Sequence, residues 1–89
     1  TKAAQWGLVN SVTSVEELIP YCLSLAEKIT VNGPLAVSAC LKSVNANLKD
    51  GVNGFDVEIS EFAKCFGTQD FEEGISAFLE KRKANFSGD

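Results

Sequence analysis

The chain has 89 residues, a formal net charge of −4, and 45% hydrophobic against 22% charged residues. A chain of this length forms one small domain at most, and the composition is that of a globular protein rather than a disordered one. The negative charge argues against a nucleic-acid partner, and no apolar run is long enough to span a membrane.

The first residues, from Lys2 to Gly7, have the pattern of the last turns of a helix that a glycine closes. The chain contains no methionine, so Thr1 is not a translation start as written. We therefore expect a piece of a longer protein. Residues 8–12 then alternate apolar and polar side chains, which predicts a short extended segment.

A helix is predicted over residues 14–32. Its start is a capping box, in which the Ser14 hydroxyl accepts from the backbone of Glu17 and the Glu17 carboxylate reaches back. Pro20 lies inside the helical pattern, so we expect a kink or a delayed start there. The apolar residues that follow at helical spacing form one face: Leu18, Cys22, Leu25, Ala26 and Ile29.

Three further helices are predicted, over residues 34–48, 54–66 and 69–82. Gly33 followed by Pro34 ends the preceding helix and begins the next, and Thr68 is suited to cap the last one. The helix over 54–66 carries an apolar stripe that we expect to be mostly core: Phe55, Ile59, Phe62 and Phe66. The predicted fold class of this chain is therefore all-α, with several apolar faces wider than such a small bundle needs.

The chain offers few groups for chemistry. Histidine is absent, so neither a Ser–His nor a Cys–His nucleophile pair is possible, and no zinc site can be completed. The cysteines, Cys22, Cys40 and Cys65, are widely spaced and are expected to be reduced apolar residues. Paired glutamates occur only where helices carry charge to solvent or at their own N-termini. No catalytic residue and no metal ligand is predicted.

Two features have two interpretations each. The basic run Lys81-Arg82-Lys83 is either a solvated helix end or a site for an anion such as a phosphate. Phe62 and Phe78 are either core residues or part of a ligand platform, and on periodicity alone the core is favoured.

Residues 66–83 resemble the C-terminal signature of the crotonase family, the enoyl-CoA hydratases and isomerases. That signature reads F-x-T-x-D-x-x-E-G-x-x-A-F-x-E-K-R, and every fixed position is present here. Earlier residues follow the family's order: Gly7-Leu8-Val9-Asn10, the junction at 32–37, Lys42, and Gly54-Phe55 with Glu58. The resemblance covers essentially the whole chain.

The resemblance implies that this chain is the C-terminal helical part of a crotonase-type α/β protein, whose core is a β-β-α superhelix. Residues 1–13 would be the end of the core domain, and residues 14–89 a C-terminal helical region for trimerisation and coenzyme A binding. Hydratases of the family add water across the 2,3-double bond of enoyl-CoA thioesters in fatty-acid β-oxidation. Their two glutamates and their oxyanion-hole amides lie upstream of this chain.

The resemblance further implies that Phe62, Phe78 and Lys81 line the coenzyme A site, with Phe78 and Lys81 reaching it from a neighbouring subunit. Arg82 and Lys83 would then be a solvated helix end. The expected partners are an acyl-CoA substrate and further copies of the protein, as a trimer or hexamer. No cofactor is expected beyond the coenzyme A thioester, which is the substrate.

Other interpretations stay open from the sequence. The parent could be another acyl-CoA enzyme of the family, an isomerase or a decarboxylase, which would differ in the upstream residues. A non-catalytic helical interaction module is a third possibility, disfavoured by the first helix, which has an end but no beginning. The expected location is cytoplasmic, and this chain alone is expected to be inactive.

Overall fold

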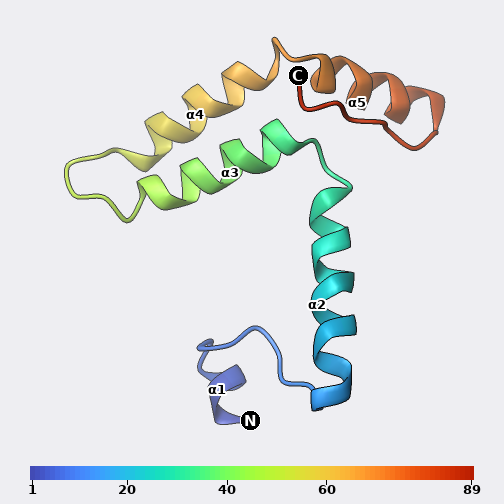
Figure 1. The fold of residues 1–89 in the computed structure, drawn as a ribbon. Coiled ribbons are helices and arrows are strands. Elements are labelled where there is room, and N and C mark those ends of the chain that lie inside the picture. The colour runs from blue at the N-terminus through green and yellow to red at the C-terminus, as the bar shows by residue number, and fades with distance from the viewer.

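The computed structural model describes residues 1–89 and contains five helices and no strand. They are α1 (Lys2–Gln5), α2 (Val15–Thr30), α3 (Pro34–Ala46), α4 (Gly54–Cys65) and α5 (Gln69–Glu80) (Figure 1). The all-α prediction is confirmed, and the four longer helices begin and end within two residues of the predicted bounds. No helix is both long and apolar enough to cross a membrane.

The N-terminal segment is partly as expected. α1 ends in a turn that Gly7 closes with a φ of 72°, a conformation that glycine adopts without steric cost. The expected extended segment at 8–12 is not a strand, because residues 8–10 bend and pair with no other segment. A strand needs a neighbouring strand for its backbone groups, and this all-helical chain offers none.

α2 begins at Val15, directly after its predicted cap, Ser14. The Ser14 hydroxyl accepts a hydrogen bond from the Glu17 backbone N–H at 3.3 Å. Of the kink or delayed start expected at Pro20, the delayed start is wrong, because the helix runs without a break from Val15 to Thr30. Pro20 cannot donate to the Glu16 carbonyl, but Glu16 is exposed, so water can solvate that group.

α3 and α4 pack against each other as an antiparallel hairpin, and no other pair of helices makes extensive contact (Figure 1). The Asn53 side chain caps α4 by accepting from the Phe55 N–H at 3.1 Å. Gly54 is buried at the start of α4, where a Cβ would collide with the Asn47 side chain. A glycine therefore allows the loop between the two helices to close tightly.

Thr68 joins α4 to α5. Its hydroxyl donates to the Cys65 carbonyl at 2.8 Å and accepts from the Phe71 N–H at 3.1 Å, so one side chain satisfies groups at both helix ends. After α5 the chain turns back, and residues 81–89 run beside that helix towards its start (Figure 1). This returning segment is called the tail below.

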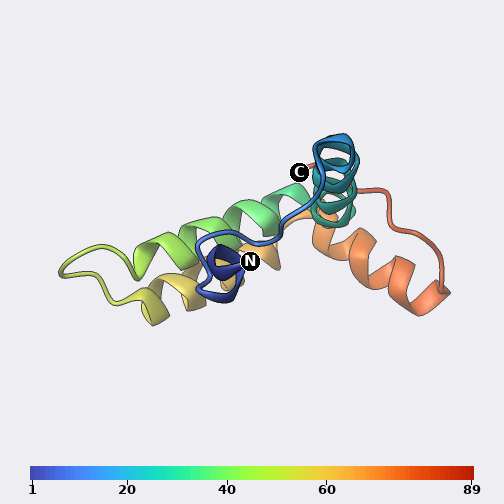
Figure 2. The same cartoon turned by 90° about the horizontal axis from the view of Figure 1, so that it is seen from below.

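The core of this chain is very small. Only two apolar side chains are buried, Ala46 and Ala77, at 5% and 2% exposure. The radius of gyration is 16.8 Å, whereas a compact domain of this length would have about 12 Å. The helices lie in a flat, open arrangement 18 Å thick, with α2 extending away from the α3–α4 hairpin (Figures 1 and 2).

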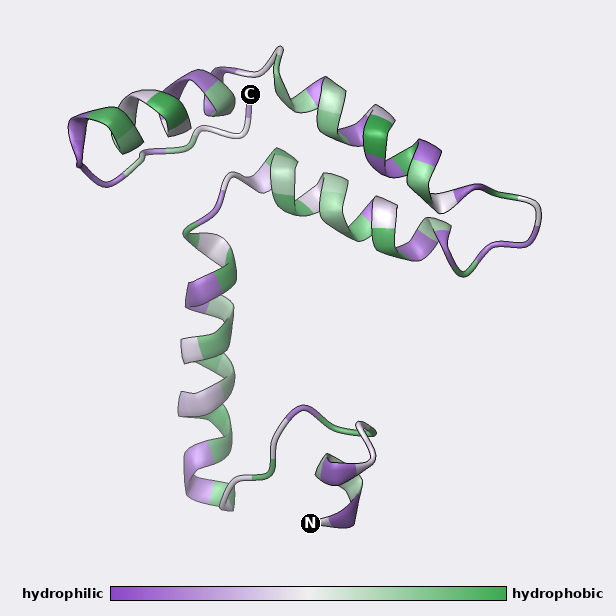
Figure 3. Ribbon diagram, turned by 180° about the vertical axis from the view of Figure 1, so that it is seen from behind, coloured by the Kyte–Doolittle hydropathy of each residue, from purple (hydrophilic) through white to green (hydrophobic).

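The predicted aromatic core stripe is therefore wrong within this chain. Phe55, Ile59, Phe62 and Phe66 are each more than half exposed. Periodicity predicted the face correctly, but the helices do not close over it, and apolar bands stay uncovered along α2, α3 and α4 (Figure 3). Faces wider than a small bundle needs were expected, and they are present.

Candidate functional site

The three predicted coenzyme A residues lie on the surface of this chain. Phe62 is on α4 and 64% exposed, whereas Phe78 is in the last turn of α5 and 83% exposed. Lys81 follows α5 directly and is exposed. Of the two interpretations of the rings, a core role is absent within this chain, and both rings are free to contact something outside it.

Phe62 lines an apolar groove between α3 and α4, of about 720 Å³. Its ring packs edge-on against Phe66 with centroids 5.1 Å apart, and Phe66 packs against Phe71 of α5 at 4.5 Å. These aromatic contacts link α4 to α5 and hold Phe62 at the rim of the hairpin.

Phe78 lines a second groove, of about 350 Å³, between α5, the start of α3 and Phe86 of the tail. The two grooves share Ala36, Cys65 and Phe71, so they lie next to each other. The structure nevertheless places Phe62 and Phe78 in separate grooves, and Lys81 in neither. Within one chain the three residues do not form a single cavity.

Lys81 has a left-handed backbone, with φ 56° and ψ 39°. The Lys81 N–H donates to the Phe78 carbonyl and the Arg82 N–H to the Ala77 carbonyl, the two bonds of a Schellman motif. Glycine normally occupies this position, and a residue with a Cβ costs roughly 1 kcal/mol there. Lys81 is the only non-glycine residue of the chain with a positive φ.

The same motif closes α1, which gives an internal comparison. There the Gly7 N–H donates to the Ala4 carbonyl and the Leu8 N–H to the Ala3 carbonyl. The left-handed position is Gly7, as the motif prefers. α5 thus ends like α1, but with a lysine where α1 has a glycine.

Arg82 is exposed just after α5, as expected for a helix end, but its side chain is also ion-paired, which was not expected. Its guanidinium donates to both carboxylate oxygens of Glu73, Nη1 to Oε1 at 2.6 Å and Nη2 to Oε2 at 2.8 Å. Its Nε donates to Glu80 at 2.6 Å. The turn at Lys81 brings Arg82 back over α5, where two carboxylates meet it. Lys83 is exposed and makes no ion pair with an acidic group.

Glu73 binds the tail at two points. Besides pairing with Arg82, its Oε1 accepts the Asn85 backbone N–H at 2.7 Å. The hydrogen bonds from Arg82, and next from Asn85, lower the pKa of Glu73 to about 2. The hydrogen bonds that Arg82 donates to Glu73 and Glu80 in turn raise the pKa of Arg82.

Asp70 holds the end of the tail. It is buried, at 6% exposure, and its carboxylate accepts from the Ser87 N–H at 2.7 Å and the Gly88 N–H at 3.0 Å. Its own N–H donates to the Asp89 carbonyl at 3.1 Å. Sequence reasoning missed this role of Asp70, because its partners lie 17 and 18 residues further on.

Glu61 of α4 forms an ion pair with each helix of the α3–α4 hairpin. Its carboxylate accepts from Lys64 at 2.6 Å and lies 3.6 Å from Lys42 of α3. The Lys64 hydrogen bond, ahead of the charge of Lys42, lowers the pKa of Glu61. A general acid needs a raised carboxyl pKa. Both shifted carboxylates of this chain, Glu61 and Glu73, move the other way, as ion-paired structural groups do.

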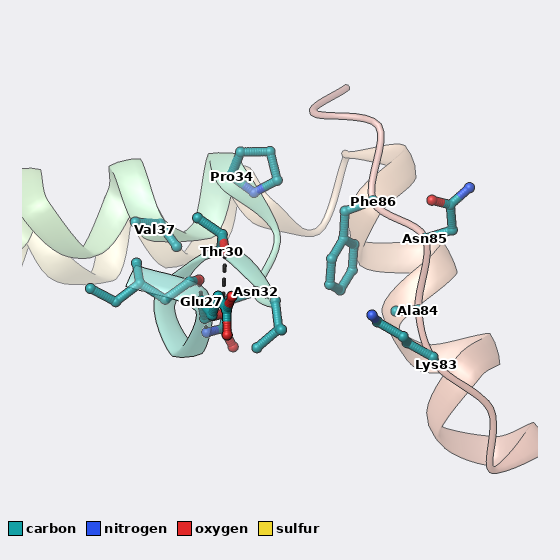
Figure 4. A pocket seen from close by; sticks show the side chains of 11 residues that line it. Glu27, Thr30, Asn32, Pro34, Val37, Lys83, Ala84, Asn85 and Phe86 are labelled. Carbon is teal, nitrogen blue, oxygen red and sulfur yellow. Dashed lines mark hydrogen bonds between the residues drawn. The ribbon is translucent and has the colours of Figure 1, made fainter. Parts of the chain in front are cut away.

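A third cavity, of about 690 Å³, lies between the end of α2, the start of α3 and the tail (Figure 4). Thr30 donates to the Glu27 carbonyl on one side, at 3.3 Å, and Phe86 and Lys83 come from the tail on the other. None of the three predicted residues lines it.

The cysteines are all free. Cys22 and Cys40 are exposed and Cys65 is half-buried. Cys22 lies on the uncovered α2, which explains its exposure. No three His, Cys, Asp or Glu side chains come together as a metal site would need.

Comparison with known proteins places these features in context. A family model described as enoyl-CoA hydratase/isomerase matches residues 1–89. A crotonyl-CoA hydratase of Syntrophomonas wolfei is 42% identical over 96% of this chain and 33% of its own length. A methylmalonyl-CoA decarboxylase of Escherichia coli is 33% identical over 98% of this chain and 34% of its own length.

The fold agrees with the sequence match. The crystal structure of an enoyl-CoA hydratase from Bacillus anthracis superposes with a TM-score of 0.90 and 34% identity, over 99% of this chain and 34% of that one. The chain spans about a third of the length of the curated relatives it matches, and it corresponds to their C-terminal part.

Proposed function

The chain belongs to the enoyl-CoA hydratase/isomerase family, and on that basis we propose that it forms the C-terminal helical part of an enoyl-CoA hydratase. The reaction is the addition of water across the 2,3-double bond of an enoyl-CoA thioester, in fatty-acid β-oxidation. The observation that carries the proposal is the match of the whole chain, in sequence and in fold, to hydratases. We also propose a cytoplasmic location, which the free cysteines support.

Within that enzyme, the role of this chain is to bind coenzyme A and to hold the subunits together. Residues 1–13 would end the core domain, and residues 14–89 would form the region for trimerisation and coenzyme A binding. Uncovered apolar bands on α2, α3 and α4 support a role in assembly as a trimer or hexamer (Figure 3). The lowered pKa values of Glu61 and Glu73 support a chain that leaves acid–base chemistry to other residues.

Phe62, Phe78 and Lys81 would contact coenzyme A. The exposed rings offer flat apolar surfaces, and the Lys81 ammonium suits a phosphate. Phe62 and Phe78 lie in separate grooves of one chain. That separation supports a site built between subunits, with Phe78 and Lys81 supplied by a neighbour.

A second candidate is another acyl-CoA reaction of the same family. The family description includes isomerases, and the decarboxylase of Escherichia coli matches nearly the whole chain. The product separates these candidates, since a hydratase yields a 3-hydroxyacyl thioester, an isomerase a shifted double bond, and a decarboxylase a shorter acyl group.

The test is a hydration assay on the complete enzyme, following loss of the conjugated thioester absorbance with a short enoyl-CoA. Lys81→Ala should raise KM several-fold and leave kcat intact, because the contact binds substrate and transition state equally. An exposed charge contact contributes about 0.2–1 kcal/mol, so the effect should shrink as salt rises.

Lys83→Ala is the matched control, because it removes an equally exposed charge two positions away, and its KM should stay at the parent value. An unchanged KM for Lys81→Ala at low salt would mean that the run Lys81-Arg82-Lys83 is only the end of a helix and does not bind coenzyme A. Two outcomes would replace hydratase by the second candidate: a shift of the double bond of the enoyl-CoA in place of hydration, or decarboxylation of a carboxylated acyl-CoA by an enzyme that does not hydrate the enoyl-CoA.

A further inference from the structure

We propose that Glu73 and Arg82 are positioning residues for coenzyme A binding: their paired hydrogen bonds hold Lys81 in the left-handed conformation from which its ammonium meets the ligand. The inference rests on the proposed function and assigns to Glu73 and Arg82 a task that requires no contact of their own with the ligand.

The backbone at Lys81 is held from both sides. On the helix side, the Lys81 and Arg82 N–H groups bond to the carbonyls of Phe78 and Ala77. On the tail side, the Arg82 guanidinium forms a two-bond fork with Glu73, at 2.6 and 2.8 Å. A left-handed residue with a Cβ persists only where its surroundings over-determine it. A rotation at Lys81 would swing Arg82 away from Glu73 and break the fork.

The turn after α1 has the same hydrogen bonds without an ion pair, so it shows what Glu73 and Arg82 contribute at Lys81. Gly7 adopts the same conformation, and the next residue, Leu8, makes no ion pair. A glycine needs no such anchor because it has no steric cost to offset. The anchor is present where the left-handed residue carries a long cationic side chain.

Glu73 also fixes the tail beyond the turn. It accepts the Asn85 N–H at 2.7 Å, and Asp70, one turn earlier on α5, accepts from Ser87 and Gly88. The tail therefore cannot drift over the Lys81 side chain. Fixing the backbone before the ligand arrives lowers the entropy lost on binding, which is the general benefit of preorganisation.

The pair also keeps the Lys81 amine available. The nearby acids Glu73 and Glu80 are both occupied by Arg82, and Lys81 makes no ion pair with any acidic group of the chain. If Arg82 were lost, these carboxylates would be free to attract the neighbouring ammonium away from a phosphate. Arg82 thus engages both acids that would otherwise compete for Lys81.

The experiment uses the complete enzyme and two substrates, an enoyl-CoA and the corresponding enoyl-pantetheine thioester, which lacks the nucleotide and its phosphates. Glu73→Gln keeps the size of the side chain and an acceptor for Asn85, but removes the ionic fork. It should raise KM for the CoA thioester about two- to five-fold, no more than Lys81→Ala does, as expected for an exposed charge contact. KM for the pantetheine thioester, and kcat with both, should stay unchanged.

Three further variants make the result specific. Glu72→Gln, at an exposed neighbour that pairs with no basic group, should match the parent enzyme. Arg82→Lys keeps the charge but not the fork, and should behave like Glu73→Gln. In a Lys81→Ala background, Glu73→Gln should raise KM no further, because the residue it positions is gone.

A rise in KM with both thioesters, or a fall in kcat, would show that the pair only stabilises the fold, and would overturn the proposal. An unchanged KM in both Glu73→Gln and Arg82→Lys would overturn it as well. The proposed contact of Lys81 with coenzyme A fails separately: in that case Lys81→Ala itself leaves KM for the CoA thioester unchanged. The proposed hydratase function fails by a third outcome, the absence of a hydration product with the parent enzyme.

Discussion

Lys81 has a left-handed backbone conformation, which favours glycine, and it carries a long cationic side chain, which glycine lacks. Replacing it by glycine should relieve the steric cost of the left-handed conformation and stabilise the complete enzyme by about 1 kcal/mol per chain. The same change should raise KM for the CoA thioester as much as Lys81→Ala does. Thermal unfolding and the hydration assay measure the two effects.

Lys81→Ala is the control for both effects, because alanine keeps the Cβ and loses the rest of the side chain with its amine. Its melting temperature should lie near that of the parent, and that of Lys81→Gly above both. A glycine variant no more stable than the alanine variant would mean that the φ of 56° at Lys81 carries no steric cost.

The sequence could place single residues only where their partners are near in the chain. Ser14 and Thr68 were predicted as caps because each bonds to an N–H three residues on. Asp70 and Glu73 were missed as anchors because their partners lie nine to eighteen residues away, across a turn. That turn needs a left-handed lysine, which no residue preference indicates.

Helices were predictable as elements for the same reason, since their hydrogen bonds and caps are local. The extended segment predicted at 8–12 did not form a strand, because alternating apolar and polar residues form a strand only where another strand can pair with them. Exposure was not predictable either: the spacing of Phe62 and Phe66 defines a face, but what covers that face is a property of other segments. The predicted contacts of Phe62, Phe78 and Lys81 with coenzyme A stay predictions.

The tail should stay attached to α5 in moderately acidic solution. Because folding lowers the pKa of Glu73 from 4.5 to about 2, its ionised form stabilises the folded tail fully above pH 4.5. That contribution is lost as the pH falls from about 4.5 towards 2. The Asn85 amide, which donates to Glu73, should therefore keep its NMR chemical shift from pH 6 to about 4, in the complete enzyme labelled at asparagine.

Glu73→Gln provides the comparison, since it removes the titrating group and should abolish any shift of the Asn85 signal that follows this carboxylate. A midpoint near 4.3, the value of an unperturbed glutamate, would show that Arg82 does not hold Glu73 in solution.

At the scale of the whole molecule, this chain exposes apolar surface that a folded domain would cover. Large side chains on all of the longer helices are exposed, among them Leu18, Ile59 and Phe78. Residues 1–89 produced alone should therefore be helical by circular dichroism but should self-associate and bind hydrophobic dyes.

The same isolated chain should have no hydratase activity, because the residues for acid–base chemistry are proposed to lie outside it. The assay is the one used for the complete enzyme, with the complete enzyme as positive control. Turnover above the buffer background, in material free of that enzyme, would mean that catalytic groups are present among these residues after all.

Most close contacts of this chain join residues fewer than twelve positions apart in the sequence, and this has a consequence for folding kinetics. The α3–α4 hairpin and the return of the tail onto α5 each close a loop of a few tens of residues or fewer, and such loops form fast. Burial of the apolar bands, by contrast, has to wait for another surface. Docking or subunit assembly is then the slow step, and until it is complete these bands are the part of the molecule most exposed to misassembly.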